Sequence, residues 1–197
     1  MNTITERKFH CLLLLLLFAL LMMVVCSISL GRYYISPVHV VKIILAPLYP
    51  MVQDWSNQAS SVIYTLRLPR ALAAMMIGAA LSLSGASYQS VFKNPLVAPD
   101  MLGVSSGACV GASLCILLGF SQAGVQGGAF VGGLLAVFLA VSIPRIIGKN
   151  SIVMLVLSGI IVSGLTGSLL GIIKYLADSD TQLPAITYWQ VGSLVFG

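Results

Sequence analysis

Two arginines, Arg67 and Arg70, lie three residues apart in the run Arg67-Leu-Pro-Arg70, just before a long apolar stretch. A guanidinium group is a rigid fork that matches a carboxylate or a phosphate. The pair can therefore serve in either of two ways. It can anchor the chain to lipid headgroups, as arginines at the ends of membrane spans do, or it can bind carboxylates of a soluble partner.

A second pattern, Gly103-Val-Ser105-Ser-Gly107, matches the G-x-S-x-G sequence of serine hydrolases. That nucleophile needs a strand-to-helix turn, a histidine and an acidic residue. The chain has only two histidines, His10 and His39, both outside the predicted membrane spans, and no strand is predicted before Gly103. We therefore reject a hydrolase, expect no enzyme activity in this chain, and assign these glycines to close helix packing.

The cysteines give no sign of a metal site. All four lie inside apolar runs and none forms a CxxC pair, which predicts small apolar residues within helices rather than metal ligands. They are Cys11, Cys26, Cys109 and Cys115. We expect neither a metal nor a cofactor.

The composition is that of an integral membrane protein. Of the 197 residues, 58% are apolar and 8% are charged, whereas soluble domains carry about 25% charged residues. This excludes a soluble enzyme and a nucleic-acid reader, although the net charge is +5, because the basic residues form no cluster. The predicted spans carry no Asp, Glu, Lys, Arg or His, so we expect the driving energy to come from outside the membrane.

Charge-free runs mark the spans. A helix needs about 20 apolar residues to cross about 30 Å of hydrocarbon. Five runs meet this length and predict an all-α, polytopic transmembrane helix bundle over residues 1–197, with spans at about 11–30, 71–92, 101–120, 127–144 and 150–173. Residues 31–70 are predicted as an outer loop with a short surface helix near Val38–Leu45, and Ser121–Gly128 as a turn. Residues 183–197 are too short to cross.

The first run is too long for a signal-peptide core and no Ala-x-Ala site follows it, so we expect an uncleaved span. With the N-terminus inside, five basic residues fall on each side. Those in short segments count most in the positive-inside rule, and these favour a cytoplasmic N-terminus.

Small residues repeat every four positions in three of the spans. In the last span they are Gly159, Ser163, Gly167 and Gly171, and similar spacing links Gly103, Gly107 and Gly111, and Gly128 and Gly132. This spacing makes flat grooves in which helices approach closely. Packing within the bundle is the plain interpretation, and a face lining a translocation path is the alternative.

The order and spacing of several short motifs resemble the permease subunits of type II ABC importers for iron-siderophores, haem and vitamin B12. These motifs are Arg67-Leu-Pro-Arg70, Gly78-Ala79, Ser84-Gly85, Gln89, Asn94-Pro95-Leu96, Pro99, Leu102-Gly103-Val104-Ser105, Gly107-Ala108, Leu157-Ser158-Gly159 and Tyr188-Trp189-x-x-Gly192-Ser193-Leu194. The resemblance covers about Arg67 to Leu194. The residues before Arg67 match the family only in having a first span and an outer loop.

The resemblance implies a fold with about ten helices, of which this chain holds about five. It also implies a second permease copy or a missing half as partner, cytoplasmic ATPase subunits that supply the energy, and a soluble substrate-binding protein outside. The location implied is the bacterial inner membrane, with the N-terminus in the cytoplasm. No nucleic acid is expected.

Particular residues match motifs of that family. Arg67 and Arg70 match arginines that dock the binding protein. Asn94, Pro95, Leu96 and Pro99, with Gly103 after them, match the connection between the second and third helices, where the two prolines limit the backbone. Asn150 and Ser151 fall where the family has its inner gate.

The chain ends at Gly197, before the coupling loop and the later helices that the family pattern would supply. We therefore expect a truncated or split permease, with a non-transporting docking anchor or inactive remnant as the alternative. No span carries a distinctive ligand-binding group. Iron chelates are the first candidates for cargo, followed by haem, cobalamin and oxyanions such as molybdate.

Overall fold

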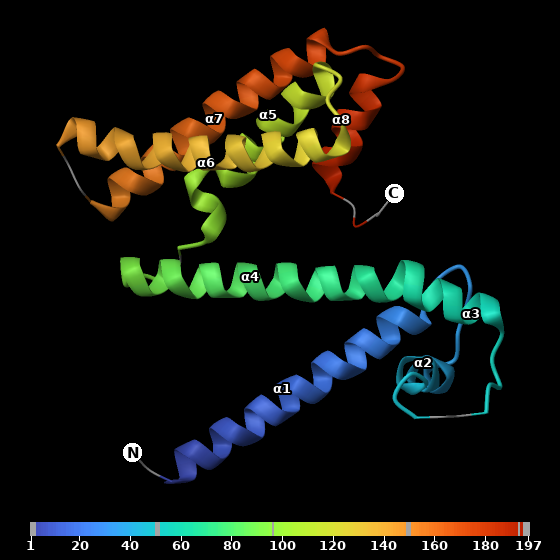
Figure 1. The fold of residues 1–197 in the computed structure, drawn as a ribbon. Coiled ribbons are helices and arrows are strands. Elements are labelled where there is room, and N and C mark those ends of the chain that lie inside the picture. The colour runs from blue at the N-terminus through green and yellow to red at the C-terminus, as the bar shows by residue number, and fades with distance from the viewer. Residues whose placement is uncertain (1–2, 50–51, 96, 149–150, 193, 195–197) are drawn as a thin grey trace. The chain divides into compact units, whose positions relative to one another are not determined.

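The computed structural model describes residues 3–49, 52–95, 97–148, 151–192 and 194. This part of the chain is helical and contains no strand, which confirms the predicted all-α class. The elements are α1 (Thr3–Ser29), α2 (Pro37–Leu45), α3 (Asn57–Ser61), the π-helix η1 (Val62–Arg67), α4 (Leu68–Phe92), the 3-10 helix η2 (Pro99–Leu102), α5 (Val104–Leu117), α6 (Gln122–Ile147), α7 (Ile152–Leu176) and α8 (Gln182–Val191). Figure 1 shows them. They form two compact units that divide within α4, one over Met1–Gly78 with Leu194–Gly197 and one over Ala79–Ser193.

The first unit folds around the end of α1. Helix α1 ends at Ser29, and the chain turns back through α2, which begins at Pro37 in the first helical position that proline favours. The hydroxyl of Ser56 caps α3 by accepting from the backbone N–H of Ala59 at 3.2 Å. We call the region from Ile28 to Arg67 the outer cap, after the outer loop that the sequence predicts here.

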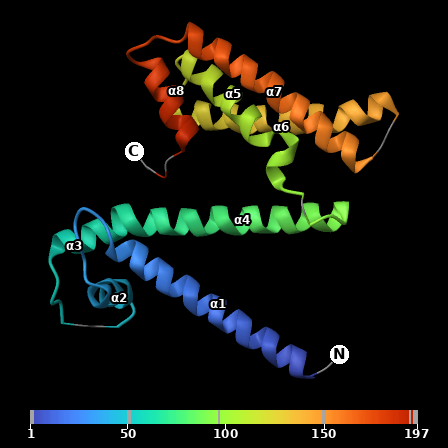
Figure 2. The same ribbon diagram turned by 180° about the vertical axis from the view of Figure 1, so that it is seen from behind.

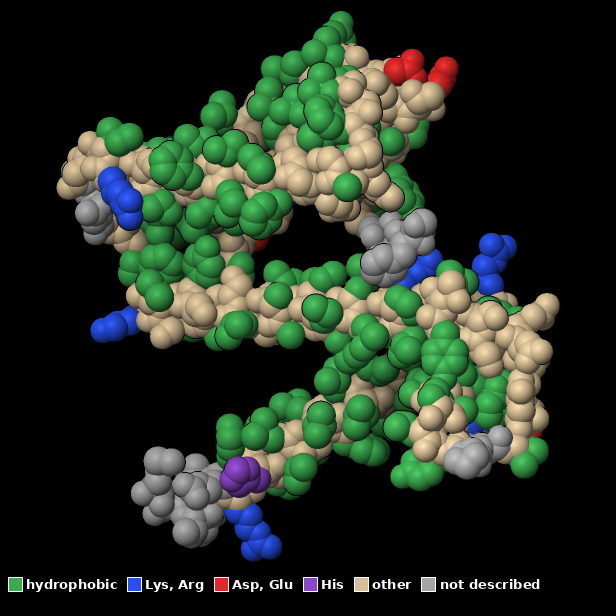
Figure 3. Space-filling view, viewed as in Figure 1, with side chains coloured by type: hydrophobic (Ala, Val, Ile, Leu, Met, Phe, Trp, Pro, Cys, Tyr) green, Lys and Arg blue, Asp and Glu red, His purple; other side chains and the backbone are tan. Residues whose placement is uncertain are grey.

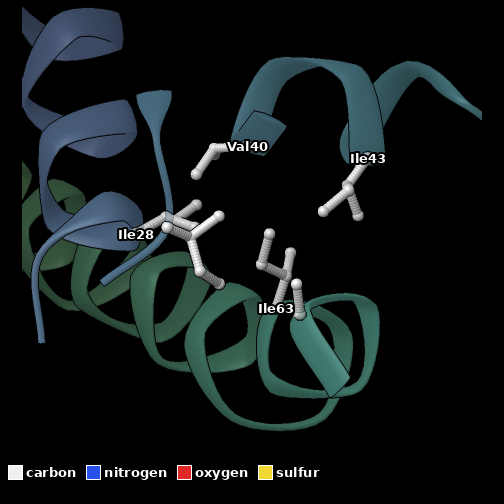
Figure 4. Close-up of a cluster of buried hydrophobic side chains, with 6 residues drawn as sticks. Ile28, Val40, Ile43 and Ile63 are labelled. Atoms are coloured by element: carbon white, nitrogen blue, oxygen red, sulfur yellow. The ribbon is translucent and has the colours of Figure 1, made fainter. Parts of the chain in front are cut away.

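A small apolar core holds the outer cap together. Its side chains come from the end of α1, from α2 and from the start of the helix that leads into α4, and Figure 4 shows four of them pointing toward one another. The buried members are Ile28, Ile35, Val40, Ile43, Ala59 and Ile63. The stretch predicted as a loop is therefore largely structured, and the predicted surface helix is present as α2.

The second unit is a bundle. Helices α5, α6 and α7 pack against one another, and α8 packs against α5, an arrangement that Figures 1 and 2 show from opposite sides. Buried residues of α5, α7 and α8 form one cluster, with Val110, Leu170, Ile173 and Ile186 among its members. The short connection after Gly119, whose φ is +72°, returns the chain from α5 to α6.

Four helical stretches are long and apolar enough to cross a membrane. They are Arg7–Ser29, Asn57–Phe92, Gln122–Ile147 and Ile152–Leu176. The predicted third span corresponds to α5, which is apolar but has 14 residues and so measures about 21 Å at 1.5 Å per residue. Pro99 starts the separate η2 turn and Gly103 adopts a left-handed φ of +75°. The α-helix therefore starts later than the sequence predicted.

Two other boundaries differ from the prediction. The second long helix starts at Asn57 and not at Ala71, because η1 continues into α4 without a break. The predicted turn Ser121–Gly128 lies almost wholly inside α6, which begins at Gln122. Its glycines suggested a turn, but Gly128 packs against α5, in agreement with the packing expected from its four-residue spacing to Gly132.

The surface agrees with a membrane environment. Large apolar side chains are exposed along α1, α6 and α7. In the space-filling view of Figure 3, apolar side chains lie along the flanks of the helices, whereas basic and acidic ones gather at helix ends and connections. Apolar flanks with polar ends are the expected surface of helices that lie in lipid.

Candidate functional site

Arg67 is bound inside the outer cap. Its Nη1 donates to the carbonyl oxygens of Ile28 at 2.5 Å and Ser29 at 3.1 Å, and its Nη2 donates to the carbonyl oxygen of Tyr33. The last carbonyl groups of a helix have no partner within it and carry the negative end of the helix dipole. Arg67 therefore closes the end of α1 with hydrogen bonds and with charge.

Gly31 makes room for this guanidinium. A Cβ on Gly31 would lie 2.6 Å from Nη2 and 3.2 Å from Cζ of Arg67, and its φ of +155° also disfavours a side chain. The turn after α1 thus wraps around the arginine head group. Nothing in the spacing of the sequence pointed to this pairing of Gly31 with Arg67.

Arg70 lies one helical turn later, in α4, and is exposed, whereas Arg67 is half-buried. Arg67 ends the π-helix η1 and Arg70 belongs to the first turn of the α-helix that follows. The two arginines that the sequence treats as a pair therefore lie in different surroundings.

Three further polar contacts brace the outer cap. The hydroxyl of Tyr64 donates to the carbonyl oxygen of Ile43, and the buried hydroxyl of Ser29 donates to that of Ile35. On the surface, Nζ of Lys42 binds the carboxylate of Asp54. This side-chain hydrogen bond holds the pKa of Asp54 below its usual value. Local patterns in the sequence did not mark these contacts, whose partners lie 21, 6 and 12 residues apart.

The connection before α5 lies within the second unit. The backbone N–H of Asn94 donates to the carbonyl oxygen of Gln89 at 3.2 Å, and η2 follows from Pro99. Pro95 is exposed in this turn, and Leu96, which the family motif includes, lies outside the described residues. Gly103 closes the connection, and a Cβ on it would lie 2.9 Å from Oγ of Ser163.

Helix α7 packs onto this connection through Gly159. A Cβ there would lie 2.9 Å from the carbonyl carbon of Met101 and 3.1 Å from Cα of Leu102. Next to it the buried Ser158 donates to the carbonyl oxygen of Ala140 in α6 at 2.6 Å. The connection is therefore fixed against α7, and α7 against α6.

The small-residue row of α7 divides into two halves. Gly159 and Ser163 contact the connection, whereas Gly167 and Gly171 are exposed and a Cβ on either would meet no atom within 4 Å in the described part of the chain. The four residues are evenly spaced along α7, but only the first two are packed against the connection.

Helices α5 and α6 touch through glycines on both sides. A Cβ on Gly107 would lie 2.6 Å from the carbonyl oxygen of Gly132, and one on Gly128 would lie 2.8 Å from that of Gly111. Backbone meets backbone here, which confirms the close packing predicted from the four-residue spacing. Along this contact and the neighbouring α7 runs an apolar groove of about 400 Å³.

The remaining candidates can be placed briefly. Ser151 caps α7 by accepting from the N–H of Met154 at 3.2 Å, and Asn150, the other predicted gate residue, lies outside the described residues. Ser105 lies in the first turn of α5. No group of three or more metal-binding side chains is found among the described residues.

The end of the second unit that holds α8 carries the acidic side chains of the α7–α8 connection. The carboxylate of Asp178 accepts from the backbone N–H of Thr181 at 2.9 Å and from its hydroxyl at 2.8 Å. These hydrogen bonds hold the pKa of Asp178 below its usual value. Nζ of Lys174 donates to Oε1 of Gln190 at 2.5 Å, which ties α7 to α8.

Comparison with known proteins identifies the family. The model of the FecCD transport family matches residues 16–196, most of the chain. The chain belongs to the FecCD transport family. It is 36% identical to the molybdate import system permease of Haemophilus influenzae over 86% of this chain and 50% of that relative. It is 33% identical to a vitamin B12 import system permease of Escherichia coli over 94% of this chain and 52% of the relative.

The fold agrees with this membership. The chain is similar to a solved metal-chelate type ABC transporter in an inward-facing conformation, with a TM-score of 0.72, 34% sequence identity and coverage of 90% of this chain and 52% of that one. The FecCD-family chain is thus a multi-pass membrane protein of a transport family. It spans about half the length of the relatives it matches.

Proposed function

We propose that this chain supplies membrane-spanning helices to the permease of a binding-protein-dependent ABC importer in the bacterial inner membrane. The observation that carries the proposal is the likeness in fold, at a TM-score of 0.72 and 34% identity, to a metal-chelate type ABC transporter. ATP hydrolysis is assigned to a separate cytoplasmic ATPase chain. This agrees with the absence of Asp, Glu, Lys, Arg and His from the apolar runs predicted as spans.

The proposed orientation has the N-terminus in the cytoplasm. The outer cap and Arg70 then lie on the outer side, and Arg145 at the end of α6 lies on the inner side. Arg7 and Lys8 support this, because they precede α1's apolar run in a short segment, where basic residues favour the cytoplasm. The outer end of α4, with Arg67 and Arg70, is the proposed docking region for carboxylates of a soluble substrate-binding protein.

The proposed cargo is an iron chelate such as an iron-siderophore. Among the relatives are iron chelatin permeases of Helicobacter pylori, 40% and 38% identical over 70% of this chain. Molybdate is the second candidate, because the similarity to the molybdate permease extends over 86% of this chain. No described side chain of the apolar groove discriminates between the two.

Transport in cells tests the proposal. The chain is expressed with the ATPase, the binding protein and any further permease chain encoded beside it, in a host that lacks its own permeases of this family. Uptake of a ⁵⁵Fe-labelled siderophore and of ⁹⁹Mo-molybdate is then measured with and without this chain. ATP-dependent uptake of one label that requires the chain is the expected result.

Two other outcomes are informative. Retention of the binding protein at the membrane without uptake of either label favours the docking anchor over the transporter. Neither uptake nor retention, with the chain folded in the membrane, contradicts the proposed function.

A further inference from the structure

Helix α2 of the outer cap has two apolar faces. One faces the core of the cap, where Val40 and Ile43 are buried. The other consists of Val38 and Val41, which are exposed, and Leu45, which is half-buried. The spacing i, i+3, i+7 places these three residues on one side of the helix. We call this side the outward face of α2, and the packing of the cap core does not account for it.

Exposed apolar side chains continue on both sides of α2 in the chain. Leu48 and Tyr49 after the helix are 73% and 63% exposed, and Leu30 and Tyr34 before it are 65% and 67% exposed. Apolar surface that gathers in this way marks a site of contact with a protein or a membrane. Tyrosine is typical of the boundary between hydrocarbon and water, because its ring is apolar and its hydroxyl is polar.

Helix α2 lies at the level where α1 leaves the membrane. The span Arg7–Ser29 is apolar up to its end, and α2 packs against α1. Ile28, in the last turn of α1, shares the cap core with Val40 and Ile43 of α2, as Figure 4 shows. The exposed apolar flank of α1, which is expected to face lipid, is therefore continuous with the surroundings of α2.

The direction of α2 also fits the membrane surface. In Figure 1, α1 is seen from the side and α2 nearly end-on, so the axis of α2 runs across that of α1. A helix that crosses the direction of a span runs along the membrane, and the nine residues of α2 are too few to cross it. An amphipathic helix in this position can bury its apolar face at the boundary of headgroups and acyl chains.

Basic groups border the outward face. Arg32 is exposed in the turn between α1 and α2, and Lys42 lies on α2 with its Nζ bound to the carboxylate of Asp54. Long basic side chains at the edge of an apolar surface reach lipid phosphates while their stems stay in apolar surroundings. Together with the tyrosines and the apolar flank of α1, this favours lipid over a second protein as the cover of α2.

We propose that α2 is an interfacial helix whose outward face, Val38, Val41 and Leu45, inserts into the lipid leaflet at the end of α1. With the orientation proposed above, this is the outer leaflet of the inner membrane. The inference requires only that α1 spans the membrane and does not depend on the importer function. It assigns a membrane contact to a segment that the sequence predicts as part of an outer loop.

Spin labels test where the outward face lies. The full chain, with its native cysteines replaced by alanine, is labelled at a cysteine in place of Val41 and placed in nanodiscs of phosphatidylethanolamine and phosphatidylglycerol. Power saturation compares collisions with oxygen, which concentrates in lipid, and with a water-soluble nickel complex. The controls are labels at Gln58, exposed on α3 of the same cap, and at Leu17, exposed on α1. We expect the oxygen-to-nickel ratio at Val41 to exceed that at Gln58 about threefold and to approach that at Leu17.

Two results would overturn the proposal. A ratio at Val41 equal to that at Gln58 places the outward face in water. Few collisions with both reagents show that protein covers the face, and this assigns it to a partner chain in place of lipid.

Substitution gives a second test that needs no label. The double variant Val38→Gln/Val41→Gln should raise hydrogen exchange in α2 several-fold in the same nanodiscs, because the side chains that hold the helix in lipid become polar. Glutamine favours helix more than valine does, so intrinsic helix propensity cannot explain a rise. Val52→Gln makes the same change at an exposed valine outside α2 and should leave exchange in α2 as it was. Unchanged exchange in the folded double variant would contradict the insertion.

Discussion

The outer cap and the α5–α6 contact hold helices together by opposite means. In the outer cap, the ends of helices are joined by long side chains, with Arg67 and Tyr64 donating to backbone carbonyl groups. In the α5–α6 contact, side chains are missing and the backbones of Gly111 and Gly128 touch. The outer cap depends on hydrogen bonds that side chains add, whereas the α5–α6 contact depends on space that no side chain fills.

This difference has a consequence for substitution. A glycine contact fails when any atom is added, because the neighbouring backbone cannot move aside cheaply. A side-chain brace fails when atoms are removed and carbonyl groups lose their donors. Matched pairs of variants in the two regions can therefore separate the two kinds of packing.

The largest effect is expected in the α5–α6 contact. Gly111→Ala places a Cβ against the carbonyl group of Gly128, and the overlap with backbone should lower stability by about 1–3 kcal/mol. Thermal unfolding in detergent, followed by size-exclusion chromatography, measures the change. Gly127→Ala is the control, because a Cβ there meets nothing within 4 Å in the described part of the chain, and alanine should be neutral or stabilise the helix by about 0.5–1 kcal/mol. Equal losses in the two variants would contradict the contact.

The next effect is expected in the outer cap. Arg67→Met keeps much of the side-chain volume but removes the two hydrogen bonds to the end of α1 and the one to Tyr33, and should lower stability by about 1–2 kcal/mol. Hydrogen exchange should rise over residues 28–35. The matched variant Arg70→Met, on an exposed side chain, should change stability by less than about 0.5 kcal/mol. A cap that exchanges no faster in Arg67→Met would show that the brace is dispensable.

A smaller effect is expected at the far half of the α7 row. Gly167→Leu should change the stability of this chain by no more than about 0.5 kcal/mol, because its Cβ would meet none of the described residues within 4 Å. If Gly167 packs against other helices of an assembled permease, the same variant should reduce recovery of the complex with its partner chains. Gly159→Leu, at the packed half of the row, should destabilise the chain itself. Unfolding and co-purification, measured together, separate the two halves.

The smallest effect is expected at the surface pair of the outer cap. The pKa of Asp54 is held below its usual 3.8 by the hydrogen bond from Lys42, so the stabilisation is present above that value and is lost as the pH falls through the lowered pKa. Hydrogen exchange in α2 should therefore accelerate slightly under acid conditions below about pH 3.8. Asp54→Asn should remove this pH dependence, whereas Asp180→Asn, in the other unit, should leave it unchanged. An unaltered acid response in Asp54→Asn would assign it to other groups.

How well the sequence predicts the structure depends on how far apart in the chain the interacting residues lie. The charge-free runs overlap α1, α6 and α7, because hydrocarbon imposes helical hydrogen bonding on any such run. The glycines of 121–128 suggested a turn, since glycine is usual in turns, yet Gly128 lies within α6 against Gly111. Glycine spacing within a helix and glycine in a turn look alike until the partner helix is known.

The candidate site follows the same rule. The motif Arg67-Leu-Pro-Arg70 could be found from the sequence, as could the connection around Pro99 and Gly103. The sequence could not show that Arg67 binds Ile28 and Tyr33, because those partners are 39 and 34 residues away. Nor could it show that Gly159 and Ser163 pack against other described residues whereas Gly167 and Gly171 do not.

The sequence by itself determined that this chain is an all-α membrane protein of an importer-like family, because hydropathy and short motifs are local properties of the chain. The tertiary structure alone decided which of two similar arginines is engaged, which glycines touch backbone, and where α5 begins. Those outcomes depend on groups brought together from distant parts of the chain, whose contact energies no local pattern of residues contains.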